Sequence, residues 1–409
     1  MSPICFGGLD FGSSGARISV INTEKEIIYS NTSKYRYQFS NPESWRISCQ
    51  ELLSEIPAPL KKDLCKISIS GTSGTLLACN KNGNFLGKAI PYYQRCYEDK
   101  KTLEFLSKDN AFLNNPYSSL AKALELIRIY GEDILLRHQA DWISGWLIGN
   151  WSFGEEGNNI KLGWDIESGS WPDSYISLPW NKCLPNISKS GEILGRIKDF
   201  LANKLELNKR LLIVAGTTDS NAAYLSSQIM KEEGLTVLGT TMVLKKGIDK
   251  PVKEPGITIH RVNEEWICGG ASNAGCGILS KFFSDSQIKE LSRQINTSKS
   301  TNLNLLPLNS IGERFPINDP LLKPVLEPRP VSDALYLQAL FEGLASIELK
   351  GWERIKDLTG SLPKKIITIG GGAKNPQWRS IREKIIKIPI VSCNQTTSYG
   401  SALIAIASN

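Results

Sequence analysis

The stretch ICFGGLDFGSSGARISVI, residues 4–21, decides the fold. Its first apolar run, Ile4 to Leu9, ends in Asp10, and the small residues Gly12 to Gly15 separate it from a second run, Ala16 to Ile21. Glycine and small hydroxyl residues between β-rich runs predict a tight turn that joins two strands. Glu26 to Ser30 is predicted to continue this meander as a third strand.

A similar pattern returns much later in the chain. Leu235 to Leu238 is predicted as a strand, Gly239-Thr240-Thr241 as a turn, and Met242 to Lys246 as a return strand. Two such units so far apart indicate a duplicated architecture with two similar half-folds. A chance match of two short segments is the alternative, and at this point both explanations stand equal.

Helical and strand patterns alternate along the rest of the chain, which predicts an α/β protein. A domain boundary is expected near residues 205–215, giving domains of 1–210 and 211–409, and residues 297–330 are expected to form an extended excursion. The predicted helices are Ser118 to Arg137, Asp141 to Gly149, Ser190 to Leu205, the segment after Asp219 to Met230, Asp333 to Leu358 with interruptions at Gly343 and Gly351, Pro376 to Lys387, and Ser398 to Ala407; the further strands are Lys66 to Ile69, Leu211 to Val214 and Lys365 to Ile369.

Composition excludes several classes of protein. Of 409 residues, 41% are hydrophobic and 22% charged, as in ordinary globular proteins, and the net charge of +7 contains no block of five like charges. A nucleic-acid partner is therefore not expected. No apolar run approaches the roughly 20 residues of a membrane span. The N-terminus lacks the features of a signal peptide, and nine single cysteines without a CxxC pair indicate reduced thiols, so a cytoplasmic location is expected.

Asp10 is the first residue that could carry chemistry, because it ends a strand directly before the small-residue turn. One explanation is a carboxylate that caps its own turn. The other is a carboxylate beside a phosphate site that holds Mg²⁺ directly or through water, while the backbone N–H groups of Gly12, Ser13 and Ser14 surround phosphate oxygens. Arg17 would lie close by, or else on the surface of the return strand.

Asp219 lies in AGTTDSNAA, residues 215–223, where a strand ends and a helix begins. Helix capping and a catalytic role are the two alternatives. Open α/β sheets bind ligands at the carboxyl ends of their strands, and a base there would accept the proton of a hydroxyl that attacks phosphorus.

Two glycine-rich loops are further candidates for ligand contact. In GGGAKN, residues 370–375, three glycines allow a flat ligand to approach the backbone, and Asn375 is a good N-cap before Pro376. Trp378 could pack on an adenine, although core packing is the commoner fate of such a residue. The loop SGTSGT, residues 70–75, is a weak signal alone, and Cys276 has no histidine near it to make it a nucleophile.

Several familiar motifs are absent or out of context. Asp10-Phe11-Gly12 matches a protein-kinase triplet but has none of the accompanying kinase motifs, so this match is a false positive. The chain also lacks a Walker A loop and the GxGxxG spacing of a dinucleotide site.

Taken in order, the motifs resemble those of the FGGY carbohydrate kinases. The resemblance rests on DxGSSxxR at 10–17, AGTTDSNAA at 215–223, LGTT at 238–241, GGGAKNP at 370–376 and SYGSALIA at 398–405, and it covers nearly the whole chain. It implies two actin-like, ribonuclease-H-like domains with an interdomain cleft for ATP and sugar. GTSGT and NNxKLGxD look closest to the short pentulose-kinase-like proteins of cyanobacteria and chloroplasts, which implies D-ribulose as substrate.

The resemblance also implies a role for each matching residue. Asp219 would be the base, and Asp10 would assist Mg²⁺ and contact the sugar, which Ser73 and Gly74 would also face. ATP would be held by Gly12, Ser13, Ser14, Gly239, Thr240 and Thr241 at its phosphates and by Gly371, Gly372, Asn375 and Trp378 at its adenosine. One departure concerns the sugar site, because Gln94 occupies the position of a usual acidic residue and Arg95 is shifted by one.

These implications give an ATP- and Mg²⁺-dependent kinase for a ketopentose, D-ribulose or alternatively D-xylulose, acting as a monomer or homodimer with no membrane partner. A non-catalytic sugar or nucleotide sensor on the same fold is a rival. A third candidate is a chaperone-like ATPase, whose hydrolysis of ATP would not require a sugar.

Overall fold

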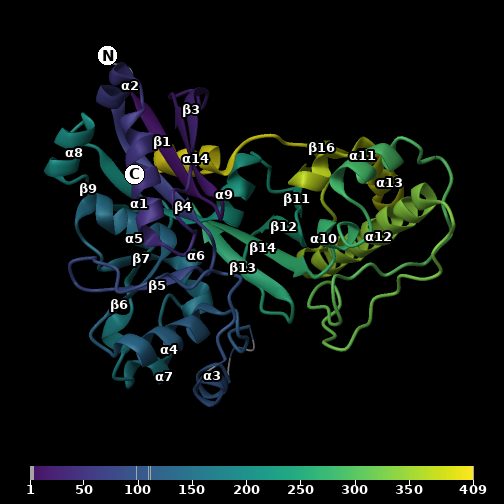
Figure 1. Ribbon diagram of the computed structural model, residues 1–409, viewed down its shortest axis with the longest axis horizontal. Coiled ribbons are helices and arrows are strands. Elements are labelled where there is room, and N and C mark those ends of the chain that lie inside the picture. The colour runs from purple at the N-terminus through teal and green to yellow at the C-terminus, as the bar shows by residue number, and fades with distance from the viewer. Residues whose placement is uncertain (1–3, 98, 109, 111, 409) are drawn as a thin grey trace. The chain divides into compact units, whose positions relative to one another are not determined.

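The computed structural model describes residues 4–97, 99–108, 110 and 112–408, and the chain folds into two compact units (Figure 1). The first unit comprises Met1–Ser226, Arg261–Glu264 and Gln395–Asn409, and the second comprises Ser227–His260 and Glu265–Asn394. This division differs from the expected partition at 210/211. The strand and helix around Asp219 and the C-terminal helix all belong to the first unit, because they pack on its sheet.

The first unit is built on a six-stranded sheet with the order β3-β2-β1-β4-β10-β9. Antiparallel β1, β2 and β3 form the predicted meander, β4 and β10 continue parallel to β1, and β9 closes the edge antiparallel to β10. The bounds of these strands are β1 Cys5–Phe11, β2 Gly15–Ile21, β3 Ile27–Lys34, β4 Leu64–Gly71, β9 Ile193–Arg196 and β10 Leu212–Thr218.

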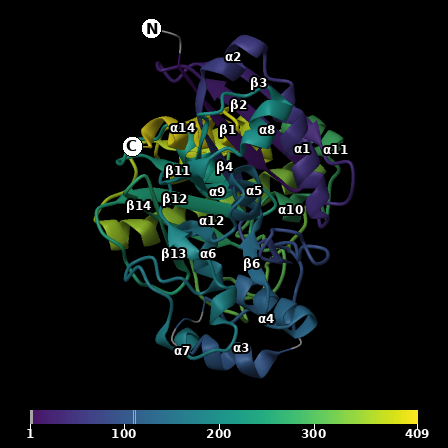
Figure 2. The same cartoon turned by 90° about the vertical axis from the view of Figure 1, so that its left-hand side faces the viewer.

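Helices cover this sheet, and two small sheets extend it. The C-terminal helix α14 packs against β1, β2 and β4 and against α9 (Figure 2). The contact with β1 requires glycine, because a Cβ atom at Gly8 would lie 2.1 Å from backbone atoms of Ser398 and Ala402. The helices of this unit are α1 Pro42–Ser54, α2 Ala58–Asp63, α3 Lys100–Leu106, α4 Ser119–Tyr130, α5 Gln139–Ile148, α6 Glu156–Asn159, α7 Asp173–Ile176, α8 Asp199–Leu205, α9 Asp219–Ser226 and α14 Thr397–Ala407, and the small sheets pair β5 Leu76–Cys79 with β6 Leu135–His138 and β7 Phe153–Glu155 with β8 Asn186–Ser188.

The second unit contains another six-stranded sheet, with the order β13-β14-β12-β11-β15-β16. As in the first sheet, the first strand, β11, is antiparallel to β12, and β12 pairs antiparallel with β14. On the other side of β11, strands β15 and β16 continue parallel to it. Its elements are β11 Gly234–Leu238, β12 Met242–Ile248, β13 Ile257–Val262, β14 Glu265–Ser272, α10 Cys276–Leu279, α11 Asp285–Ser292, α12 Asp333–Thr359, β15 Ile366–Ile369, α13 Pro376–Ile386 and β16 Ile390–Ser392. The two sheets share one strand order around their first strand, so the repeat in the sequence reflects two similar half-folds.

Three predicted helices differ from the structure. The helix predicted over Ser118 to Arg137 ends at Tyr130, where Gly131 adopts a φ of 75°, and strand β6 follows. The first part of the segment Ser190 to Leu205 is strand β9, since it pairs with the edge of β10, and the helix that begins after Asp219 stops at Ser226 rather than Met230.

The long helix α12 is continuous through Gly343 and Gly351, so the predicted interruptions are wrong. Both glycines instead allow close packing. A Cβ atom at Gly343 would lie 2.8 Å from the Leu305 carbonyl oxygen, and one at Gly351 would lie 2.8 Å from Leu244. Residues 297–330 contain isolated bridges but no described helix or strand, as the predicted excursion requires.

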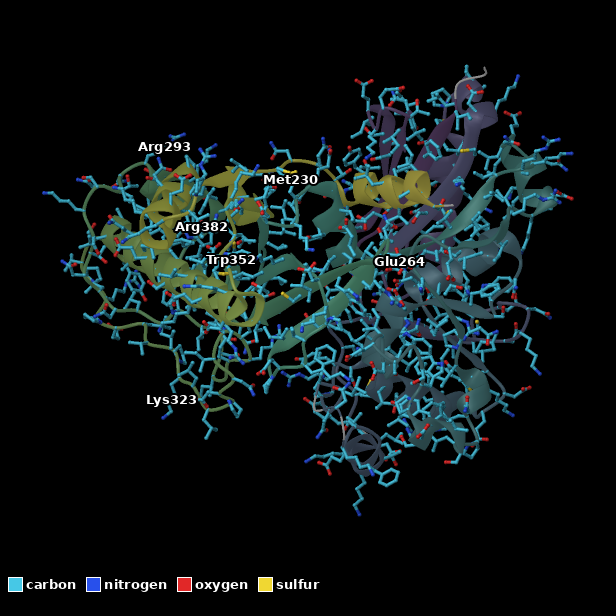
Figure 3. All side chains as sticks on the ribbon, turned by 180° about the vertical axis from the view of Figure 1, so that it is seen from behind. Met230, Glu264, Arg293, Lys323, Trp352 and Arg382 are labelled. Carbon is cyan, nitrogen blue, oxygen red and sulfur yellow. The ribbon has the colours of Figure 1, made fainter. Side chains whose placement is uncertain are left out.

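Each unit has its own hydrophobic core, with fully buried tryptophans such as Trp45 in the first and Trp352 in the second (Figure 3). The nine cysteines, all among the described residues, are free thiols. Within the described ranges, no helix combines the length and the apolar character that crossing a membrane demands.

Candidate active site

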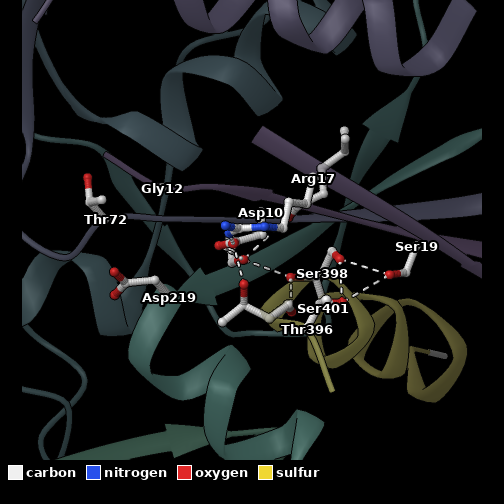
Figure 4. Close-up of polar contacts among 12 residues, drawn as sticks. Asp10, Gly12, Arg17, Ser19, Thr72, Asp219, Thr396, Ser398 and Ser401 are labelled. Carbon is white, nitrogen blue, oxygen red and sulfur yellow. Dashed lines mark hydrogen bonds and ion pairs between the residues drawn. The ribbon is translucent and has the colours of Figure 1, made fainter. Parts of the chain in front are cut away.

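Asp10 lies at the carboxyl end of β1 and is 2% exposed, so the structure surrounds its carboxylate almost completely (Figure 4). Oδ1 accepts a hydrogen bond of 3.2 Å from Ser70 Oγ on the neighbouring strand β4. Oδ2 accepts one from Thr397 Oγ1 at the start of α14 and faces Arg17 Nη1 at 3.5 Å. Arg17 itself is about half exposed, so it is both a surface residue of β2 and a partner of Asp10.

Burial sets the protonation of this carboxyl group. Loss of hydration raises the pKa of Asp10 from 3.8 to about 6, the hydrogen bond from Thr397 opposes this rise, and the charge of Asp219 adds to it. Asp10 is therefore ionised at neutral pH in a place where its charge is poorly solvated. A cation that reached it would be attracted strongly.

A layer of hydroxyl groups from α14 lies behind Asp10. Ser401 donates to Ser70 at 2.8 Å, and Ser398 lies 2.8 Å from Ser19 on β2. The SYGSALIA motif pointed to this helix, but nothing in the local sequence indicated that Thr397 contacts Asp10.

The turn after β1, residues Gly12 to Gly15, is closed by a hydrogen bond of 3.0 Å from Gly12 N to Gly15 O. The side chains of Ser13 and Ser14 are exposed, and a Cβ atom at Gly12 would meet only Gly15 O, at 3.5 Å. We call residues 12–15 the phosphate turn. Its outer side has the room that a phosphate group needs.

Asp219 is the first residue of α9, directly after β10. Thr218 Oγ1 accepts the capping bond of 3.3 Å from Asn221 N. The carboxylate of Asp219 instead accepts a bond of 2.7 Å from its neighbour, Ser220 N. The Asp219 side chain is half-exposed and close enough to Asp10 to raise the pKa of that residue. The structure thus brings together the two carboxylates that the sequence analysis singled out.

The loop after β4, residues Gly71 to Thr75, lies at the same end of the sheet, because Ser70 pairs with both Asp10 and Thr217 in register. Gln139 Oε1 accepts bonds from Thr72 N at 2.9 Å and Thr72 Oγ1 at 2.8 Å. We call residues 71–75 the substrate turn. Gln139 shapes this turn, and sequence analysis did not identify it.

Ser73 and Gly74, the predicted sugar contacts, form the tip of the substrate turn. Lys161 Nζ donates to Ser73 O at 3.4 Å, and Gly74 has a φ of 90° that favours glycine. Ser73 is half-exposed and Gly74 is buried beside the Lys161 side chain. Lys161 belongs to the NNxKLGxD stretch, which therefore supports this turn directly.

In the segment with the unusual Gln94 and Arg95, the arginine side chain contacts tyrosines. Arg95 Nη1 donates to Tyr97 Oη at 3.0 Å, and its guanidinium lies 5.0 Å from the Tyr117 ring centre. Tyr92 instead turns toward the site, with its backbone N–H donating to Thr75 Oγ1 at 3.2 Å. Burial, together with the negative charge of Asp219, raises the pKa of its phenol.

The second unit carries the other predicted nucleotide contacts at the ends of parallel strands β11 and β15. The Gly239 to Thr241 turn is held from behind by Cys276 N, which donates to Gly239 O at 2.8 Å, and by Gly277 N, which donates to Thr240 O at 3.1 Å. In the neighbouring loop, a Cβ atom at Gly371 would meet nothing within 4 Å. Both loops therefore present backbone that a ligand can approach.

Two residues that were predicted to contact ATP make contacts within the protein itself. Trp378 is 1% exposed and stacks on Phe341 with ring centres 4.9 Å apart, so neither ring face is open to an adenine. The prediction that Trp378 lines the adenosine pocket is wrong, and the core-packing alternative holds. Asn375 caps α13 by accepting from Trp378 N at 3.0 Å and donates to Ser292 at 2.8 Å.

A divalent cation would find few protein ligands here. No group of three or more His, Cys, Asp or Glu side chains within the described ranges could hold a metal ion. Mg²⁺ typically needs only one or two carboxylates and completes its shell with water and phosphate oxygens. Asp10, ionised and poorly solvated beside Asp219, fits that requirement.

Comparison with known proteins gives matches along the chain. Residues 236–408 match the family model described as FGGY family of carbohydrate kinases, C-terminal domain. A xylulose kinase of Lactococcus lactis subsp. lactis (strain IL1403) is 22% identical, with 97% of this chain and 86% of the relative covered. Among solved structures, ligand-bound xylulose kinase from Lactobacillus acidophilus has a TM-score of 0.82 at 17% identity, covering 100% of this chain and 89% of that one. Plasmodium falciparum glycerol kinase with ADP has a TM-score of 0.82 at 18% identity, covering 98% and 89%. The fold is therefore the expected pair of actin-like, ribonuclease-H-like domains.

Proposed function

We propose that this chain, a sugar kinase of the FGGY family by its similarity to that family, transfers the γ-phosphate of ATP to a terminal hydroxyl of a ketopentose. The observation that carries the proposal is the proximity of Asp10 and Asp219 at one end of the first sheet. Both carboxylates lie beside turns whose backbone is open to a ligand. D-ribulose is the proposed sugar.

In this mechanism Asp219 is the base. Its half-exposed carboxylate accepts the proton of the sugar hydroxyl as that oxygen attacks the γ-phosphorus of ATP. The bond from Ser220 N to Asp219 Oδ1 helps to orient the carboxylate. Ser73 and Gly74 on the substrate turn orient the sugar.

The phosphates of ATP are held by backbone N–H groups and hydroxyls of the phosphate turn and of Gly239 to Thr241, and Gly371 and Gly372 approach the adenosine. Mg²⁺, when bound, neutralises charge on the phosphates during transfer. Asp10 would hold it, directly or through water, and Arg17 and Thr397 keep that carboxylate in place. Asn375, the cap of α13, supports the glycine-rich loop of residues 370–375.

D-xylulose is the second candidate sugar, and the similarity to proteins described as xylulose kinases favours testing it. Gln94 stands where an acidic residue is usual, and the neighbouring Arg95 contacts tyrosines. This segment is where the protein would distinguish one pentulose from another. We further propose that the protein acts in the cytoplasm, as a monomer or a homodimer.

An assay of ADP release tests this function. The purified chain is given ATP and Mg²⁺ with D-ribulose, D-xylulose, L-ribulose, L-xylulose, glycerol or no sugar. ADP release that requires D-ribulose supports the proposal, and release that requires D-xylulose moves the substrate but keeps the kinase. ADP release that is equal without any sugar would indicate an ATPase, and none in any mixture would indicate a sensor.

A further inference from the structure

Four buried side chains of the second unit form one hydrogen-bonded network. Glu348 on α12 accepts bonds from Arg382 Nε at 2.6 Å, from Arg382 Nη2 at 2.7 Å and from Thr236 Oγ1 at 2.6 Å. Arg382 on α13 also donates to Thr368 Oγ1 at 3.0 Å. Each of these residues is at most 1% exposed. We call the four residues the Glu348 network, which joins helices α12 and α13 to strands β11 and β15.

The two strands of this network lead into the loops that the proposed function assigns to ATP. Thr236 and Thr368 lie opposite each other in the parallel pair of β11 and β15. The turn of Gly239 to Thr241 begins three residues after Thr236, and the glycine-rich loop of residues 370–375 begins two residues after Thr368. The Glu348 network therefore fixes both strands close to the points where these loops begin.

The glycine-rich loop is held at both of its ends. It starts from β15, which contains Thr368, and leads into α13, which contains Arg382, so the bond between these two side chains joins the two ends. The loop also packs on the end of β11, because a Cβ atom at Gly370 would lie 2.5 Å from the carbonyl oxygen of Leu238. A shift of α13 relative to β15 would consequently move the loop.

A buried ion pair is a costly way to hold two helices together. Removing both charges from water is unfavourable, and apolar side chains of similar volume often give a fold that is equally or more stable. A network whose members are hydrogen-bonded to one another does, however, specify one arrangement of the elements that it joins. Such an arrangement matters most where two of the elements end in loops that one ligand must meet together.

We infer that the Glu348 network positions the Gly239 to Thr241 turn and the glycine-rich loop for ATP, with Glu348 and Arg382 as positioning residues. The inference rests on the proposed binding of ATP by these loops. The network acts through the ends of β11 and β15 and through the start of α13, because its side chains are themselves buried. Loops that are already held in place lose less freedom when a ligand binds, so the network raises the affinity for ATP.

A variant that restores stability without restoring the network tests the inference. Arg382→Met leaves the Glu348 carboxylate buried without its charged partner, whereas the further change Glu348→Leu removes that carboxylate, so the urea midpoint of the double variant should lie closer to that of the unchanged chain. Calorimetry would measure the affinity of the folded protein for the Mg²⁺ complex of β,γ-imido-ATP, without sugar. We expect the double variant to bind this analogue about tenfold more weakly than the unchanged chain, although its stability has recovered.

Thr368→Val is a milder change, because it keeps the ion pair and removes the hydroxyl that joins the pair to β15. It should weaken binding of the analogue about threefold, and it decides the test if the double variant does not fold. Thr258→Val is the matched control on β13, since Thr258 Oγ1 donates to Gly269 O at 3.2 Å, outside the network. The control should bind the analogue as the unchanged chain does.

The outcomes separate the Glu348 network from the ATP site itself. Affinity equal to that of the unchanged chain, in Thr368→Val or in the folded double variant, would overturn the inference and leave the proposed kinase intact. A loss in Thr258→Val as large as that in Thr368→Val would also overturn it. Failure of the unchanged chain to bind the analogue would instead contradict the proposed ATP site, and the inference with it.

Discussion

Thr397 donates a hydrogen bond to the carboxylate of Asp10 although 387 positions separate the two residues. The C-terminal helix thus completes the environment of a carboxylate on the first strand. The contact depends on close packing of α14 on β1, for which Gly8 leaves the space. The end of the chain is therefore part of the candidate active site.

Replacing Thr397 by Val should raise the pKa of Asp10 above its value of about 6, because the hydrogen bond stabilises the ionised form. If ionised Asp10 is needed for turnover, the acidic limb of the kcat/KM profile moves to higher pH by about 1 unit. Ser398→Ala is the control, since Ser398 contacts Ser19 rather than Asp10. Identical acidic limbs in Thr397→Val and the unchanged chain would show that this bond does not control the titration.

Asp10→Asn should remove activity and yet stabilise the fold at neutral pH. The pKa of Asp10 is higher in the folded state than the usual 3.8, so ionisation destabilises the fold as pH rises from about 4 to about 6. An uncharged Asn avoids this cost, which is up to about 3 kcal/mol. Urea denaturation should show a higher midpoint for the variant at pH 7.5 and a much smaller difference at pH 4. A difference that is the same at both pH values would argue against an energetically unfavourable Asp10 charge.

The second unit contains a buried ion pair whose loss should be costly. Arg382, which is labelled in Figure 3, donates to both oxygens of Glu348, at 2.6 Å and 2.7 Å. The two side chains are 1% and 0% exposed. Arg382→Met leaves a buried carboxylate without its partner and should destabilise the unit by about 3–5 kcal/mol.

The exposed pair of Arg354 and Glu254 provides the control for that change. Its side chains are 36% and 42% exposed, so Arg354→Met should cost less than about 1 kcal/mol. Urea midpoints of both variants would be compared with the unchanged chain. Similar losses for the two pairs would mean that burial does not set their contributions.

The glycine-rich loop after β15, residues 370–375, offers a test with neighbouring glycines. A Cβ atom at Gly372 would lie 2.5 Å from the Trp378 ring and 2.9 Å from Leu238, whereas one at Gly371 would meet nothing within 4 Å. Gly372→Ala should lower stability by about 1–3 kcal/mol through overpacking, and Gly371→Ala should leave it unchanged. Thermal denaturation of both variants checks this, and equal melting temperatures would show that Trp378 can move aside.

Local sequence patterns predicted the residues whose roles follow from chain neighbours. Asp10 at a strand end, Asp219 at a helix start and Asn375 as a cap all lie as expected, because strand ends, turns and caps depend on a few adjacent residues. The repeated turn also predicted two half-folds. Apolar spacing nevertheless predicted a helix as far as Arg137, whereas the helix ends at Tyr130, directly before Gly131.

Other features depend on contacts between distant segments and could not be predicted in this way. Thr397 and Gln139 reach the site only once the sheet has assembled. The burial of Trp378 depends on its stacking against Phe341, which lies on another helix. The position of Asp219 in the first unit likewise follows from the pairing of β10 with β4 rather than from its place in the chain.

Single-turnover phosphoryl transfer by Asp219→Asn tests the proposed kinase most directly. The variant would be mixed with radiolabelled ATP, Mg²⁺ and the sugar that supports turnover in the unchanged chain, and the labelled sugar phosphate would be followed with time. Loss of the base should slow transfer by about 10²- to 10⁴-fold, while calorimetry shows that the ATP analogue still binds. Transfer at the rate of the unchanged chain would contradict the assignment of Asp219 as the base and, with it, the proposed site.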